Sequence, residues 1–244
     1  MFWPYSFRHT INLFYDQWCG LLGIGPDQDV YAEELHDDLA AHYHFDRQGQ
    51  LMERIEEDPT SGITLPRAHL PAGTIEPTPV RVAHPLNFGP ELVDTSLDME
   101  LMRSLVHQLS LPERLFLQTA GLLPVEVPPP AILGILDSRV TSEAEIEPGQ
   151  FAVCRRLRVA YRPPASPVAG SDRYQLCTFA VLQSLDLAEL DQPLTETLLP
   201  ATVLGIELMW PTDVIAAGNQ LYVADSANGR TGRTSRIGVF ERRL

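Results

Sequence analysis

The chain has 244 residues, of which 44% are hydrophobic and 20% charged, a composition typical of a globular protein with a substantial core. Its formal net charge of −14 would repel a phosphate backbone, so nucleic acid is not expected as a partner. Every basic residue is arginine, and the absence of lysine excludes chemistry that needs an ε-amine, such as a Schiff base or a P-loop.

The charge is unevenly distributed along the chain. Residues 1–60 hold twelve acidic side chains and three arginines, whereas residues 230–244 hold five arginines and one glutamate. The sequence therefore predicts an acidic N-terminal face and a basic C-terminal tip, which either attract each other, serve as separate docking surfaces or are simply two solvated faces.

Cysteine usage and the N-terminus bear on the compartment. Cys19, Cys154 and Cys177 are an odd and sparse set for a secreted scaffold, and none belongs to a C-x-x-C pair. We see neither a signal-peptide pattern nor an apolar stretch of roughly 20 residues that would cross a membrane. These features predict a cytoplasmic protein without a membrane span.

The first 60 residues predict an acidic α/β segment. Residues 7–16 have the β-branched and aromatic content of a strand. Residues 30–43 predict a helix, because Leu35, Leu39 and Tyr43 recur every four residues. Residues 44–55 predict two short strands joined by a tight turn at Gly49, where glycine can adopt positive φ.

The next stretch, residues 61–109, predicts a linker and a helix. Proline is dense between residues 58 and 90, which favours extended or turning backbone. A Leu/Met stripe over residues 97–109 then predicts a helix with Thr95 or Ser96 at its N-cap.

Residues 110–244 predict a β-rich domain. Residues 114–119 and 131–137 are short apolar runs, and residues 151–162 alternate strictly enough to indicate a half-buried strand. Residues 174–182 predict a second strand that pairs with it antiparallel, and residues 184–200 predict a helical turn. The fold class expected for the whole chain is therefore mainly β with a few helices.

The C-terminal residues 210–240 carry a family pattern. Proline precedes an apolar strand at Val214 and Ile215, Gly218 and Asn219 form a turn, and Leu-Tyr-Val-Ala-Asp-Ser at 221–226 leads through Asn228 to an apolar strand after Arg236. This segment resembles one blade of an NHL-type β-propeller. The resemblance implies a partial or degenerate propeller, and another β-rich fold is the alternative.

The segment also departs from that family. Seven residues, 229–235, separate Asn228 from Arg236, where the pattern normally continues almost directly. The insertion lengthens the turn and weakens any transfer of a surface role to Arg236. Asp225 is expected at the strand end, where its carboxylate can accept hydrogen bonds from the amides of the following turn.

Five residues are weak candidates for holding a divalent metal. His42, His44 and Asp46 have the His-x-His-x-Asp spacing of a metallo-β-lactamase site, but that family requires a late histidine and every histidine here precedes residue 108. Asp225 and Asn228 are similar to metal-side residues of propeller lactonases. A surface role for the histidines is the plainer interpretation.

The sequence lacks a self-consistent catalytic set, so we expect a non-catalytic binding or scaffolding protein with a protein partner and no cofactor. Two alternatives remain open at this point. One is a metal-dependent lactonase or esterase built on a propeller, and the other is a subunit of a larger assembly.

Overall fold

The fold consists of three four-stranded antiparallel sheets, accompanied in the described part of the chain by one helix of four residues. The computed structural model describes residues 3–36, 39–56, 70–78, 80, 131–162, 175–187, 195–199, 201–229 and 232–243. The chain is therefore mainly β, as the sequence predicts.

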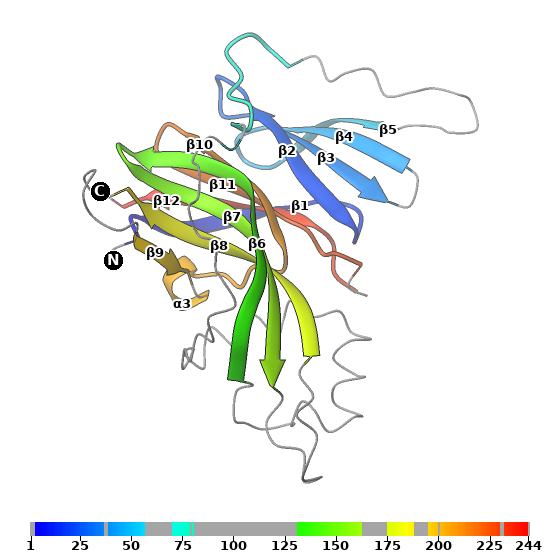
Figure 1. Ribbon diagram of the computed structural model, residues 1–244. Coiled ribbons are helices and arrows are strands. Elements are labelled where there is room, and N and C mark those ends of the chain that lie inside the picture. The colour runs from blue at the N-terminus through cyan, green and yellow to red at the C-terminus, as the bar shows by residue number, and fades with distance from the viewer. Residues whose placement is uncertain are drawn as a thin grey trace.

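The strands of each sheet are mostly consecutive in the sequence (Figure 1). The first sheet contains β2 (Trp18–Ile24), β3 (Val30–His36), β4 (Leu39–Phe45) and β5 (Leu51–Glu56). The second contains β6 (Ala131–Glu147), β7 (Gln150–Arg162), β8 (Gln175–Asp186) and β9 (Thr195–Leu198). The third contains β10 (Pro211–Ala217), β11 (Gln220–Asp225), β12 (Arg236–Arg242) and β1 (Tyr5–Asn12), with α3 (Ala201–Leu204) preceding β10.

The third sheet joins the two ends of the described chain. In Figure 1 the blue strand β1 runs beside the red strand β12, and the two pair antiparallel from Tyr5 opposite Arg242 to Asn12 opposite Arg236. Strand β1 thereby covers the edge of β12 that β11 leaves open. The N-terminal region is consequently divided between the third sheet and the first.

The third sheet is also buried on both faces. All six residues of β11 are buried, which is expected of a strand covered on each side rather than on one. One face packs on the first sheet through Ile215, Ala217, Tyr222, Ala224, Ile237 and Val239. The other face packs on the second sheet and on Leu199, Leu204 and Leu208 through Val214, Leu221, Val223 and Phe240.

Several predicted strands are confirmed. Strand β7 pairs antiparallel with β8, as the alternation over residues 151–162 and 174–182 indicates. The turn at Gly49 has a φ of 83°, and Gly218, with a φ of 61°, joins β10 to β11. The helical turn expected within 184–200 is absent from the described residues of that stretch, which end β8 and form β9, and α3 begins at Ala201.

The helix predicted over residues 30–43 is wrong, because the chain forms strands β3 and β4 there. Val30, Ala32 and Glu34 are buried on one face, while Leu35 is 43% exposed. The alternation of buried and exposed residues that marks a strand is hard to recognise in this sequence, because a glutamate occupies an inward position and a leucine an outward one. The helix predicted over residues 97–109 and the run at 114–119 lie outside the described residues.

Replacing Leu221 with alanine is expected to lower the free energy of unfolding by about 2–5 kcal/mol, because truncation removes apolar contacts between two sheets and leaves a cavity. Urea denaturation followed by circular dichroism measures the change. Leu51→Ala is the matched control, since Leu51 in β5 is 37% exposed and should lose less than half as much. Losses of similar size at both positions would contradict a core between these sheets.

Candidate functional site at the sheet junctions

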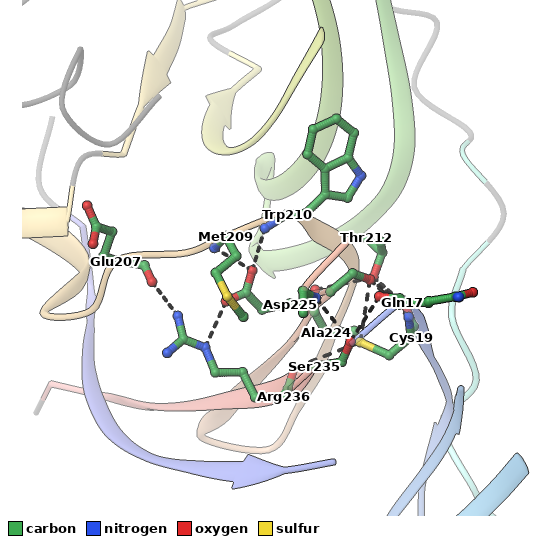
Figure 2. Close-up of polar contacts among 12 residues, drawn as sticks. Gln17, Cys19, Glu207, Met209, Trp210, Thr212, Ala224, Asp225, Ser235 and Arg236 are labelled. Atoms are coloured by element: carbon green, nitrogen blue, oxygen red, sulfur yellow. Dashed lines mark hydrogen bonds and ion pairs between the residues drawn. The ribbon is translucent and has the colours of Figure 1, made fainter. Parts of the chain in front are cut away.

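Asp225, the last residue of β11, is fully buried and accepts three hydrogen bonds (Figure 2). Its Oδ1 accepts from the amides of Met209 and Trp210, both at 2.7 Å, and its Oδ2 accepts from Arg236 Nε at 2.8 Å. The amides precede β10, so the expectation that they belong to the turn after Asp225 is wrong. These bonds fix the connection before β10 to the end of β11.

Burial raises the pKa of the Asp225 carboxyl, and the nearby Arg236 guanidinium together with the two amides opposes that rise. Arg236 also donates to the backbone carbonyl of Glu207 (Figure 2). Both carboxylate oxygens therefore have protein donors, which is the environment of a structural ion pair more than that of a metal ligand.

Asn228 lies in the turn that follows β11 but belongs to a separate network. Its backbone has a φ of 54°, a left-handed conformation that asparagine tolerates better than most residues. Its amide donates to the carbonyl of Gln17 at 3.1 Å, and Ser235 Oγ donates to the same carbonyl at 3.0 Å. This turn holds the segment that leads from β1 into β2.

Side chains of the third sheet satisfy the backbone along the edge of β2 that faces away from β3. The Cys19 amide donates to Ser226 Oγ at 2.9 Å, and the Cys19 carbonyl accepts from Thr212 Oγ1 at 2.7 Å. The Leu21 amide donates to Asp213 Oδ2 at 3.1 Å. Polar side chains thus take the place of a neighbouring strand.

The edge of β10 is satisfied in the same way by the second sheet. Ser142 Oγ in β6 accepts from the amide of Val214 at 3.1 Å, and Thr141 Oγ1 donates to the carbonyl of Thr212 at 3.0 Å. Strands β6, β10 and β2 each lie at one edge of their sheet, and we call them the first strands because the rest of each sheet extends from them. Hydroxyl and carboxyl side chains therefore link these three strands in that order. Sequence reasoning missed these serines and threonines because they match no motif.

Asp213 and Glu33 form a partly buried acidic pair beside this junction. Burial raises the pKa of Asp213, against a backbone hydrogen bond from Leu21, and burial together with the Asp213 charge raises the pKa of Glu33. Gly20 is the cross-strand partner of Glu33, and a Cβ at Gly20 would lie 2.8 Å from Asp213 Oδ2. Glycine at position 20 leaves room for the Asp213 carboxylate.

The three residues of the His-x-His-x-Asp pattern separate into different contacts. His42 Nε2 lies 3.9 Å from Glu33 Oε2, and His44 Nε2 lies 3.0 Å from Asp29 Oδ2. Asp46 Oδ1 accepts from the amides of residues 48 and 50 and so shapes its own turn. Among the described residues, no group of three or more His, Cys, Asp or Glu is arranged to hold a metal ion.

An open cleft of about 600 Å³ lies between the turns formed by residues 26–29 and 46–48, which we call the acidic cleft. Three carboxylates, Asp27, Asp29 and Asp46, line it together with one guanidinium, that of Arg47, and these residues come from two turns that the sheet places side by side. Three of the twelve acidic residues within residues 1–60 lie here. Local sequence patterns did not predict that these two turns meet, because residues 30–43 between them were expected to be helical.

Comparison with protein-family models, with curated proteins and with solved structures yields no significant match to this chain. Within the part of the chain that the structure describes, no helix is long and apolar enough to span a bilayer.

Asp225→Asn is expected to lower the free energy of unfolding by about 2–4 kcal/mol, because Arg236, whose side chain is 19% exposed, loses its counter-charge in a largely buried position. Thermal or urea unfolding measures the loss. Glu241→Gln is the control, since its ion pair with Arg8 is exposed and should be worth about 0–1 kcal/mol. An Asp225→Asn protein as stable as the wild type would rule out the structural role.

Cys19 and Cys154 are expected to resist alkylation in the folded protein. Both are fully buried, and burial raises the pKa of the Cys19 thiol to about 12 and that of Cys154 well above its usual value, so little thiolate forms. Iodoacetamide treatment at mildly alkaline pH, followed by mass spectrometry of the peptides, measures this. Modification should appear in urea, and rapid labelling of either thiol without denaturant would contradict the packing.

Proposed function

We propose that this chain is a non-catalytic scaffold that binds a protein partner, with its three sheets arranged as blades of a partial β-propeller. The strand order supports this arrangement, because each sheet proceeds outward from a first strand and β10 contacts both β2 and β6. The chain's resemblance to an NHL blade over residues 210–240 falls on the third sheet, which packs between the other two.

The observation that carries the binding function is the contrast between two sets of carboxylates. Asp225 is fully buried and hydrogen bonded to protein donors, whereas Asp27, which is exposed, and Asp29 line the open acidic cleft. With three carboxylates against one guanidinium, the cleft has an excess of negative charge, so it attracts a positively charged segment and repels an anionic one. A basic stretch of a partner protein therefore fits this surface, and nucleic acid does not.

Removing two charges from the acidic cleft is expected to weaken binding of an arginine-rich peptide by about tenfold, or roughly 1.4 kcal/mol. The variant is Asp27→Asn with Asp29→Asn, and fluorescence polarisation measures the affinity. Glu145→Gln with Glu241→Gln is the matched control, because it removes the same charge from the second and third sheets. Equal weakening in both double variants would show that only the net charge matters and would reject the cleft as the binding site.

A metal-dependent lactonase or esterase is the second candidate, and one observation favours it. The raised pKa values of Asp213 and Glu33 beside the first strands are typical of groups that transfer protons. Metal analysis and an esterase assay separate the two functions. Stoichiometric Ca²⁺ or Zn²⁺ together with activity that Asp213→Asn abolishes would reject the scaffold.

Assembly into a larger complex is compatible with the scaffold. Size-exclusion chromatography of the isolated chain addresses it, and a monodisperse monomer would count against an obligate subunit. A cytoplasmic location belongs to the same proposal, since the buried thiols of Cys19 and Cys154 are both free.

A further inference from the structure

Residues 70–78, which we call the strap, connect the first strands of the first and second sheets. The Ile24 amide donates to the Ile75 carbonyl at 2.8 Å, and the Ile75 amide donates back to the Ile24 carbonyl at 2.8 Å. Farther along, Thr78 forms an isolated bridge with Glu143 in β6. The strap thus reaches from the end of β2 to β6.

The strap lies on a seat at Gly23 that a side chain would fill. A Cβ at Gly23 would lie 2.4 Å from Thr74 Cγ2 and 3.1 Å from the Ile75 carbonyl oxygen. Gly23 is buried, and its φ lies outside the left-handed region, so close approach of the strap accounts for glycine better than backbone conformation does. The end of β2 is therefore shaped to receive an extended backbone.

The strap is held much less firmly than the rest of the β2 edge. Ile75 is 45% exposed although it forms the bridge, and residues 71–73 at the preceding turn are exposed. The amides of Cys19 and Leu21, by contrast, are bound by the buried Ser226 and the half-buried Asp213. Exposed backbone hydrogen bonds with few apolar contacts open at the lowest free-energy cost.

We propose that the end of β2 at Gly23 and Ile24 is a binding edge for an extended peptide segment of a partner, and that the strap occupies this edge in cis. The incoming segment forms the antiparallel backbone pair that Ile75 forms now, a recognition mode known as β-augmentation. An apolar side chain takes the position of Ile75, and a residue small enough for the Gly23 seat precedes it. The inference rests on the proposed protein-binding function and gives its partner a second, uncharged recognition element.

The test measures binding of a fluorescently labelled synthetic peptide with the sequence of residues 70–78 to the full chain. Ile75→Pro removes the amide that donates to Ile24 and should free the edge, so the peptide should bind this variant at least about tenfold more tightly than wild type. Gly23→Val added to Ile75→Pro should abolish binding by filling the seat. A peptide carrying proline at the position of Ile75 should not bind either variant.

Two outcomes would overturn the inference. One is equal affinity of the peptide for wild type and for a folded Ile75→Pro chain. The other comes from hydrogen exchange in the wild type, which needs no variant: the Ile24 amide should exchange much faster than the amides of β11, and equally slow exchange would show that the strap does not open. Peptide binding should be unaffected by Asp27→Asn with Asp29→Asn, so failure here leaves the acidic cleft independently testable.

Discussion

The hydrogen bonds that satisfy the open edges of β2 and β10 are the constraint on which the arrangement of the sheets depends. A strand at the edge of a sheet has backbone groups that must find partners when they are buried. Here Ser142 serves β10, while Thr212, Asp213 and Ser226 serve β2. Because each donor or acceptor comes from the neighbouring sheet, satisfying the edges also fixes how the sheets lie against one another.

Packing of the third sheet reinforces the same arrangement. Its two faces supply apolar side chains to separate clusters, so it behaves as the middle layer between the first and second sheets. The Asp225 and Arg236 pair closes one end of this layer by holding the connection before β10. The carboxylate of Asp225, which was a candidate metal ligand in the sequence, therefore has a structural role. The carboxylates that line the acidic cleft become the better candidates for recognition of a partner.

Elements with a clear local period could be predicted from the sequence, and contacts between distant segments could not. The alternation in β7 and the turn residues Gly49 and Gly218 were sufficient to locate strands and hairpins. The helix assigned to residues 30–43 failed because Glu34 is buried, where it accepts hydrogen bonds from the amides of Phe14 and Tyr15 at 3.0 and 3.1 Å. The residues next to Glu34 in the sequence do not indicate those partners, since they lie about twenty residues away.

In the candidate site, too, local features could be predicted from the sequence and contacts between distant segments could not. The position of Asp225 at a strand end could be predicted from residues 221–226, but its bonds to the segment before β10 depend on how the chain returns to the sheet. The hydroxyls of Ser142 and Thr212 acquire their roles only when three sheets meet. Their residue types are common in strands and turns, so composition gave no reason to select them.

The pairing of β1 with β12 has a consequence for biosynthesis. Ser6 and Glu241, which meet across these strands, are separated by 235 positions in the chain. A ribosome therefore releases β1 long before its partner β12 exists, and β1 has no strand of its own sheet to pair with during that interval. Contacts between such distant segments slow folding, so the nascent chain exposes Tyr5 and Ile11, which are buried in the fold, during a long interval in which chaperones have the opportunity to bind β1.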